Sequence, residues 1–266
     1  MPAEHGAWVV MLVPIMLTWL ALPPRPGPAI LLVVAAASAW LAQSTAPSVL
    51  QPLRRAEALQ WLSVLLGVFA LASFGLLVGY KQWALVPIGL VAAVLAGVHL
   101  WMRGQVRGRR LDRSGPGELL GMAGLALTGP AAYVVSRGTL DWGALVIFGA
   151  CVVFFSSGVL FVRMLLAWIR SRKASGATRW QVGRIVVGYH AVLAAGLLVL
   201  PAIVAPRAAL LAIAAFIPAI VRALWGVATL SPKVPSFKRV GVLESVYAVW
   251  FGVMMAMAWP PATGAW

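Results

Sequence analysis

Long apolar runs separated by short, charged connections are the feature of this chain that most limits its fold. Hydrophobic residues make up 62% of the sequence and charged residues 10%, and the mean hydropathy is +0.94. A helix needs about 20 mainly apolar residues to cross a bilayer, so a chain of 266 residues holds at most about ten such helices. The sequence therefore predicts a single all-α membrane domain over residues 1–266, with no room for a sizeable soluble domain.

The apolar runs are continuous, as in residues 30–41, which excludes the alternating pattern of a transmembrane β-barrel. Apolar length, Pro and Gly positions and charge together predict nine transmembrane helices. The predicted ranges are 7–22, 28–43, 58–78, 83–101, 117–136, 142–169, 182–204, 207–230 and 240–259.

Lys and Arg are distributed unevenly between alternate connections. Most of the 21 cations fall in the second, fourth, sixth and eighth connections, whereas the others carry only Arg25, Lys81, Arg137 and Arg207. Cytoplasmic connections are enriched in Lys and Arg, so we expect the N-terminus inside and the C-terminus outside. We attribute the net charge of +15 to cations that set this orientation and that contact anionic lipid head groups. The cations form no separate basic domain, so the sequence does not indicate nucleic-acid binding.

Two arginines break this pattern because they lie inside predicted helices. Arg163 lies about seven residues, or roughly 10 Å, from the charged end of the sixth helix, and Arg222 has a similar depth in the eighth. Ser156 and Arg170 share the helix face of Arg163 at a spacing of seven. Burying an arginine in a bilayer costs between about 3 and more than 10 kcal/mol, so both side chains require partners or water.

Few anionic or titratable side chains are placed to meet these arginines. Glu244 lies about one turn inside the ninth helix, and Glu4 precedes the first. His190 and His5 lie toward the same side, where a histidine can exchange a proton or bind an anion. The predicted anion site, facing the cytoplasm, comprises Glu4, His5, Arg163, His190, Arg222 and Glu244, with Gly6, Trp8, Ser156 and Arg170 in support.

Motifs for other chemistry are absent from the sequence. It contains no Gly-rich phosphate loop, paired-histidine zinc motif or Asp-rich magnesium motif, so we predict no cofactor and no metal. The lone cysteine, Cys151, excludes an intramolecular disulfide. Ser157 has no neighbouring base in sequence, so nothing there argues for nucleophilic catalysis, and whether the chain is an enzyme stays open.

The stretch Glu4-His5-Gly6-Ala7-Trp8, which opens the first predicted helix, resembles the N-terminal signature of the bacterial YwiC-like family. The resemblance implies a multi-pass inner-membrane protein of unassigned activity. It also implies that Glu4, His5, Gly6 and Trp8 are important positions.

Nine helices with the N-terminus inside also resemble, in architecture, the UbiA-type intramembrane prenyltransferases. In that family, loops after the second and sixth helices carry Asp-rich motifs that hold an isoprenoid diphosphate through magnesium. The matching segments here, residues 43–47 and 163–173, contain no aspartate. The resemblance therefore implies a helical scaffold and transfers no catalytic residue.

Three interpretations of the site follow. We favour a carrier for a small anion, held by arginines that stay charged and offer several hydrogen-bond donors. A transferase could instead grip a diphosphate-bearing lipid directly with arginines, and it would need an apolar groove open to lipid beside the site. In a non-catalytic accessory protein, the buried charges would only specify helix packing.

Overall fold

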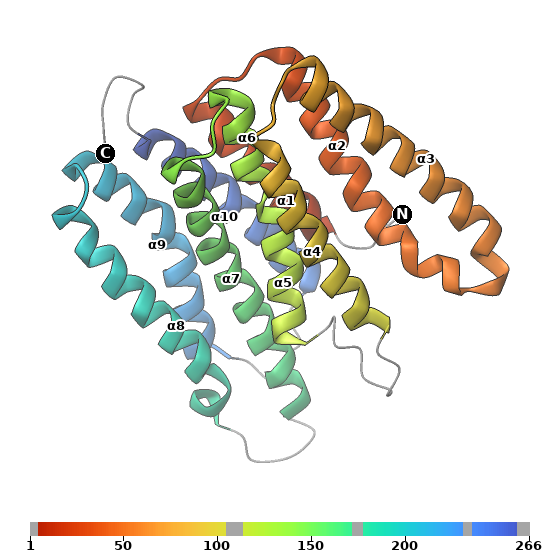
Figure 1. Cartoon of the computed structure of the whole chain (residues 1–266). Helices are drawn as coiled ribbons and strands as arrows, with labels where there is room; N and C mark the ends of the chain where they lie inside the picture. The colour runs from red at the N-terminus through yellow and green to blue at the C-terminus, as the bar shows by residue number, and fades with distance from the viewer. Residues whose placement is uncertain (1–4, 105–113, 172–177, 231–235, 260–266) are drawn as a thin grey trace.

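The computed structural model describes residues 5–104, 114–171, 178–230 and 236–259, and all regular structure in these ranges is helical (Figure 1). The α-helices are α1 (His5–Ala21), α2 (Pro26–Thr45), α3 (Arg55–Phe74), α4 (Leu85–Gly104), α5 (Gly115–Ala126), α6 (Thr128–Arg137), α7 (Trp142–Ser171), α8 (Arg179–Val199), α9 (Pro206–Ala228) and α10 (Phe237–Ala258).

Eight helical segments of the described chain are long and apolar enough to cross a membrane. Helices α5 and α6 together form one of them, Gly115–Arg137. With the shorter apolar helix α1, which has 17 residues, they correspond one for one to the nine predicted helices. The predicted all-α membrane bundle is confirmed, while the side on which each terminus lies remains a prediction.

The fifth predicted helix, 117–136, is broken at Leu127, between α5 and α6. Pro130 has no amide proton to donate to the carbonyl four residues earlier, which weakens the helix at this point. The Thr128 hydroxyl donates across to the Met11 carbonyl of α1, at 2.8 Å. The break therefore coincides with a hydrogen-bonded contact between this segment and α1.

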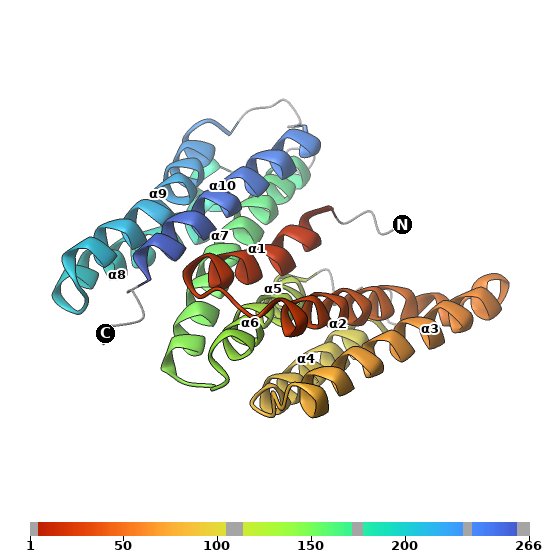
Figure 2. The ribbon, with the colours of Figure 1, turned by 90° about the horizontal axis from the view of Figure 1, so that it is seen from above.

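Helix α1 lies in the middle of the bundle, between α7–α10 on one side and α2–α6 on the other (Figure 2). It packs against α5, α6, α7 and α10. Gly129 of α6 permits this close approach, because a Cβ there would lie 2.8 Å from Ile147 Cγ2 and 3.1 Å from Pro14 Cβ. The first helix therefore joins the two groups of helices.

Aromatic side chains fill the centre of the bundle between α7, α9 and α10. The rings of Phe154 and Phe251 stack with centroids 4.2 Å apart, and Phe216 meets Phe251 edge-on at 5.3 Å. On the α9 side, Gly226 lies directly against the ring of Phe161, since a Cβ there would meet Phe161 Cε2 at 2.4 Å. These contacts fix the spacing of the helices that carry Arg163 and Arg222.

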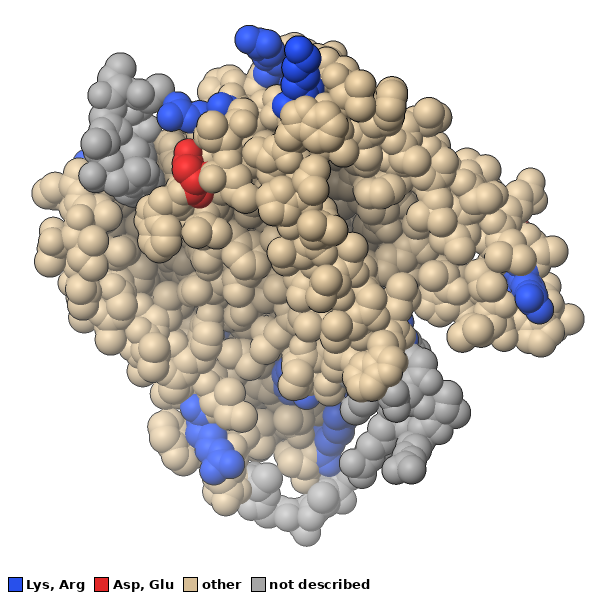
Figure 3. Space-filling view, in the orientation of Figure 1, with Lys and Arg blue, Asp and Glu red and all other residues tan. Residues whose placement is uncertain are grey.

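The outer surface is suited to lipid. Only 11% of the apolar window of α3, and likewise of α4, is buried inside the protein, so their exposed side chains are mostly apolar. On the face drawn in Figure 3, most Lys and Arg side chains gather toward the top and bottom of the molecule, another lies at the right-hand edge of the lobe, and the surface between is mostly uncharged. A transmembrane bundle requires this distribution.

Asp141 caps α7 at the end of the bundle predicted to face away from the cytoplasm. Its carboxylate accepts hydrogen bonds from the Gly143 amide at 2.8 Å and from the Thr139 hydroxyl at 3.3 Å. Partial burial raises the pKa of Asp141, but hydrogen bonds from Tyr133, Gly143 and Thr139 outweigh it and hold this pKa below its usual value.

Candidate functional site

A cavity of about 810 Å³ opens among helix ends at one end of the bundle. Its walls come from the N-terminal parts of α1 and α10, from α5, and from the C-terminal parts of α2, α4 and α7. Ligand sites in proteins commonly span about 300–1,000 Å³, so the volume is sufficient for a small molecule. The predicted topology assigns these helix ends to the cytoplasmic side.

Charged side chains line this cavity although it lies within an apolar bundle. Arg103, Arg163 and Arg170 contribute cations, and Glu118 and Glu244 contribute carboxylates. Arg163 Nη1 donates to Glu118 Oε2 at 3.1 Å, and both side chains are about one-third exposed. Sequence reasoning expected Glu4 or Glu244 as a partner for the intramembrane arginines and did not include Glu118.

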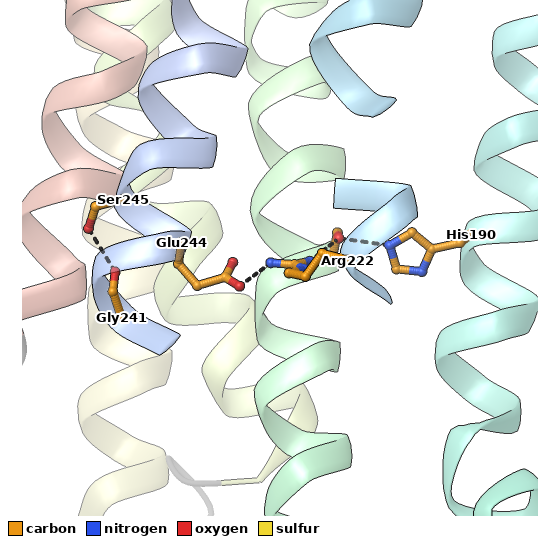
Figure 4. A network of polar contacts seen from close by, with 6 residues as sticks. His190, Arg222, Gly241, Glu244 and Ser245 are labelled. Carbon is orange, nitrogen blue, oxygen red and sulfur yellow. Dashed lines mark hydrogen bonds and ion pairs between the residues drawn. The ribbon is translucent and has the colours of Figure 1, made fainter. Parts of the chain in front are cut away.

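Arg222 lies behind the cavity wall and forms an ion pair with Glu244 (Figure 4). The Arg222 side chain is 8% exposed, whereas that of Glu244 is 24% exposed and reaches the cavity. The guanidinium also lies over the ring of Phe161, with Cζ 4.6 Å from the ring centroid. The pair therefore places a buried cation of α9 directly behind a cavity carboxylate of α10.

The same guanidinium continues a hydrogen-bond chain toward α8. Arg222 Nη2 donates to Ser157 Oγ at 2.8 Å, and Ser157 Oγ lies 2.8 Å from His190 Nε2. His190 Nδ1 lies 2.7 Å from the Val186 carbonyl, which can only accept. A proton on Nδ1 leaves Nε2 of a neutral ring to accept from Ser157, so every contact in the chain is satisfied.

Serine beside histidine is also the arrangement of a nucleophile and its base. Here both side chains are buried, and neither lines the cavity. Arg222 donates to the same Ser157 oxygen that would have to attack. The pair therefore orients Arg222 in this structure and is closed to a substrate in the cavity.

The structure separates the predicted site residues into two sets. Gly6, Arg163, Arg170 and Glu244 line the cavity. Arg222 and His190 lie behind it in the buried chain.

The remaining predicted positions lie elsewhere. Trp8 packs edge-on against Trp40, with ring centroids 4.4 Å apart. Ser156 does not line the cavity. His5 is described only as the first residue of α1, and Glu4 lies outside the described residues.

Sequence reasoning missed several cavity residues, chiefly on α4 and α5. His99 is buried and lines the cavity beside Gly121, where a Cβ would lie 3.1 Å from His99 Cε1. The clustering of all three histidines toward one end of their helices was the signal that could have included it. Within the described ranges, no group of three or more His, Cys, Asp or Glu side chains could hold a metal ion.

A family model described as YwiC-like protein matches residues 1–133. The match covers half of the 266-residue chain. The chain belongs to the YwiC-like family. This confirms the membership implied by the N-terminal signature, and it places the cavity residues Gly6, His99, Arg103 and Glu118 within the part that matches the YwiC-like model. Arg163 lies beyond that part, and so do the hydrogen-bonded residues Ser157, His190 and Arg222. No curated protein and no solved structure matches the chain.

Proposed function

We propose that this protein binds a small anion in the 810 Å³ cavity and acts as an anion carrier of the inner membrane, with the cavity facing the cytoplasm. The supporting observation is that, among the described residues, three arginines and two carboxylates line the cavity, and each carboxylate is paired with an arginine. With Arg222 behind the wall, the described part of this region holds four arginines and two glutamates.

Arginine chemistry supports an oxyanion as the ligand. A guanidinium stays charged at any pH a cell reaches, and its planar donors match the oxygens of phosphate, sulfate or carboxylate groups. Low-dielectric walls strengthen the attraction relative to water. An entering anion would compete with Glu118 for Arg163 and would gain further donors from Arg103 and Arg170.

The remaining structure is compatible with a carrier open to one side. Phe154 and Phe155 line the cavity and also belong to the buried core of the bundle. Transport would require a second arrangement in which this core opens. The chain from Glu244 through Arg222 and Ser157 to His190 ties α7, α8, α9 and α10 together, so we expect these helices to move as one unit.

Thermal unfolding of the detergent-purified full chain, with phosphate or sulfate added, tests anion binding. An anion at about a hundred times its dissociation constant should stabilise the protein by about 2.7 kcal/mol. Arg163→Gln and Arg170→Gln should reduce the effect. Arg179→Gln is the matched control, because Arg179 lies at the same end but donates to the Ala228 carbonyl and does not line the cavity.

Flux of the same anions into proteoliposomes then tests transport. Stabilisation without flux would leave a binding protein and refute the carrier. The absence of stabilisation by any oxyanion would refute the anion site, leaving the accessory interpretation in which the charges only specify packing.

A further inference from the structure

A second cavity, of about 750 Å³, lies among α2, α3, α4 and α5. Among the described residues, none that lines it is charged, and the polar ones are Gln43, Ser73, His99 and Thr128. The Thr128 hydroxyl is already bound to the Met11 carbonyl. This apolar groove therefore offers a ligand hydrocarbon contact along nearly all of its length.

The apolar groove adjoins the charged cavity, because the two share five lining residues. The residues that line both are Trp40, Gln43, His99, Gly121 and Leu125. A single molecule could therefore extend from the arginines, past Trp40 and His99, into the groove. The first part of that path is polar and the second apolar, which is the pattern of an amphiphile.

The groove is open toward the side of the bundle. Helices α3 and α4 meet at their short connection and diverge toward the end at which α4 reaches the charged cavity (Figures 1 and 2). Figure 3 shows the surface hollowed between the lobe over α3 and the rest of the molecule. Leu66 of α3 and Leu90 of α4 line the groove and remain exposed. In a membrane, this opening faces the acyl chains.

Because the groove adjoins the charged cavity, and resting on the anion site proposed above, we infer that this site also takes a long-chain anionic lipid. Its phosphate-type head group lies in the charged cavity and its hydrocarbon chain in the apolar groove. Basic pockets between transmembrane helices on the cytoplasmic side bind anionic head groups in this way. Bulk lipid alone could fill the groove, but only an anionic head would use Arg163, Arg103 and Arg170.

Binding of radiolabelled hexadecyl phosphate to the full chain in micelles provides the test. Gly89→Phe and Ala93→Phe place a ring in the groove from α4, and both positions are exposed, with nothing within 4 Å of a Cβ at Gly89. Gly67→Phe is the matched control, because Gly67 is an equally open, exposed glycine of α3 outside the groove lining. Protection of Cys151 from a maleimide reports that each variant is folded.

We expect both groove variants to weaken hexadecyl phosphate binding about ten-fold, with inorganic phosphate binding and the Gly67→Phe control unchanged. Comparing variants in the same micelles cancels the partition of the probe into detergent. If phosphate binds but the groove variants leave hexadecyl phosphate affinity unaltered, the lipid inference is wrong and the anion site stands.

Two further outcomes would also overturn the inference. Displacement of the probe by hexadecanol as effectively as by unlabelled hexadecyl phosphate would show that the head group does not contribute. Failure of both inorganic phosphate and hexadecyl phosphate to bind would remove the anion site and the lipid site together.

Discussion

Replacing Arg222 by methionine should destabilise the folded protein by about 3 kcal/mol. Removing one partner of a buried ion pair generally costs about 3–5 kcal/mol, because the other charge stays behind unpaired. In Arg222→Met the orphan is Glu244, which is 24% exposed and can draw water from the cavity, so the lower end applies. In Glu244→Met the orphan is Arg222, only 8% exposed, so the cost should approach about 5 kcal/mol.

The double variant Arg222→Met/Glu244→Met should be more stable than either single variant. It buries no unpaired charge, and methionine roughly preserves the volume of both side chains. The remaining loss is the hydrogen bond that Ser157 accepts from Arg222, worth about 1 kcal/mol. The coupling between the two positions should therefore be large and favourable in a double-mutant cycle.

Cys151 provides the assay, because it is the only cysteine and is fully buried. A maleimide dye labels it as the protein unfolds during a temperature ramp in detergent. One kcal/mol corresponds to roughly 2–4 °C in a chain of this size, so Arg222→Met should lower the midpoint by roughly 6–12 °C. Strictly additive losses in the double variant would refute the ion pair as the source of the effect.

Three further predictions concern packing, acid stability and topology. Gly226→Ala should lower the free energy of unfolding by about 1–3 kcal/mol, because the added Cβ displaces the Phe161 ring. Gly188→Ala, which has open space around its Cβ, should not destabilise the protein, and unfolding midpoints in the same dye assay would show the difference. Asp141→Asn should lower the stability of the folded protein at pH 7. Because the pKa of Asp141 in the folded protein lies below the unfolded value of 3.8, the wild type should lose its extra stability over the variant as pH falls below about 4. Acid titrations of both proteins would show this loss. In a Cys151→Ser background, Arg55→Cys should react with an impermeant thiol reagent only from the cytoplasmic side, and Lys81→Cys only from the opposite side. The reverse labelling pattern would refute the predicted orientation.

The helices could be predicted from the sequence because each spanning segment must by itself be long and apolar enough to cross the bilayer. Apolar length located all nine helices to within a few residues, and the same reasoning marked Arg163 and Arg222 as costly. Pro130 indicates a weak point in the fifth helix from the sequence, but hydropathy does not record hydrogen bonds between helices, such as that from Thr128 to α1.

The site was predicted less completely because neighbours in a bundle are not encoded by hydropathy. Depth along each helix correctly placed Glu244 near an intramembrane arginine, and the structure pairs it with Arg222. Depth alone could not show that Glu118 of α5 faces Arg163 of α7, or that Ser157 lies between Arg222 and His190. Such contacts depend on which helices are adjacent and how each is rotated.

The sideways opening between α3 and α4 determines how a lipid would reach its site. A ligand entering there diffuses within one leaflet and never crosses water, so occupancy follows its mole fraction among the surrounding lipids. Adding detergent at a constant amount of ligand would then empty the groove by dilution in two dimensions. For such a site, an affinity is meaningful per mole of lipid, and the composition of the bilayer itself sets the working concentration.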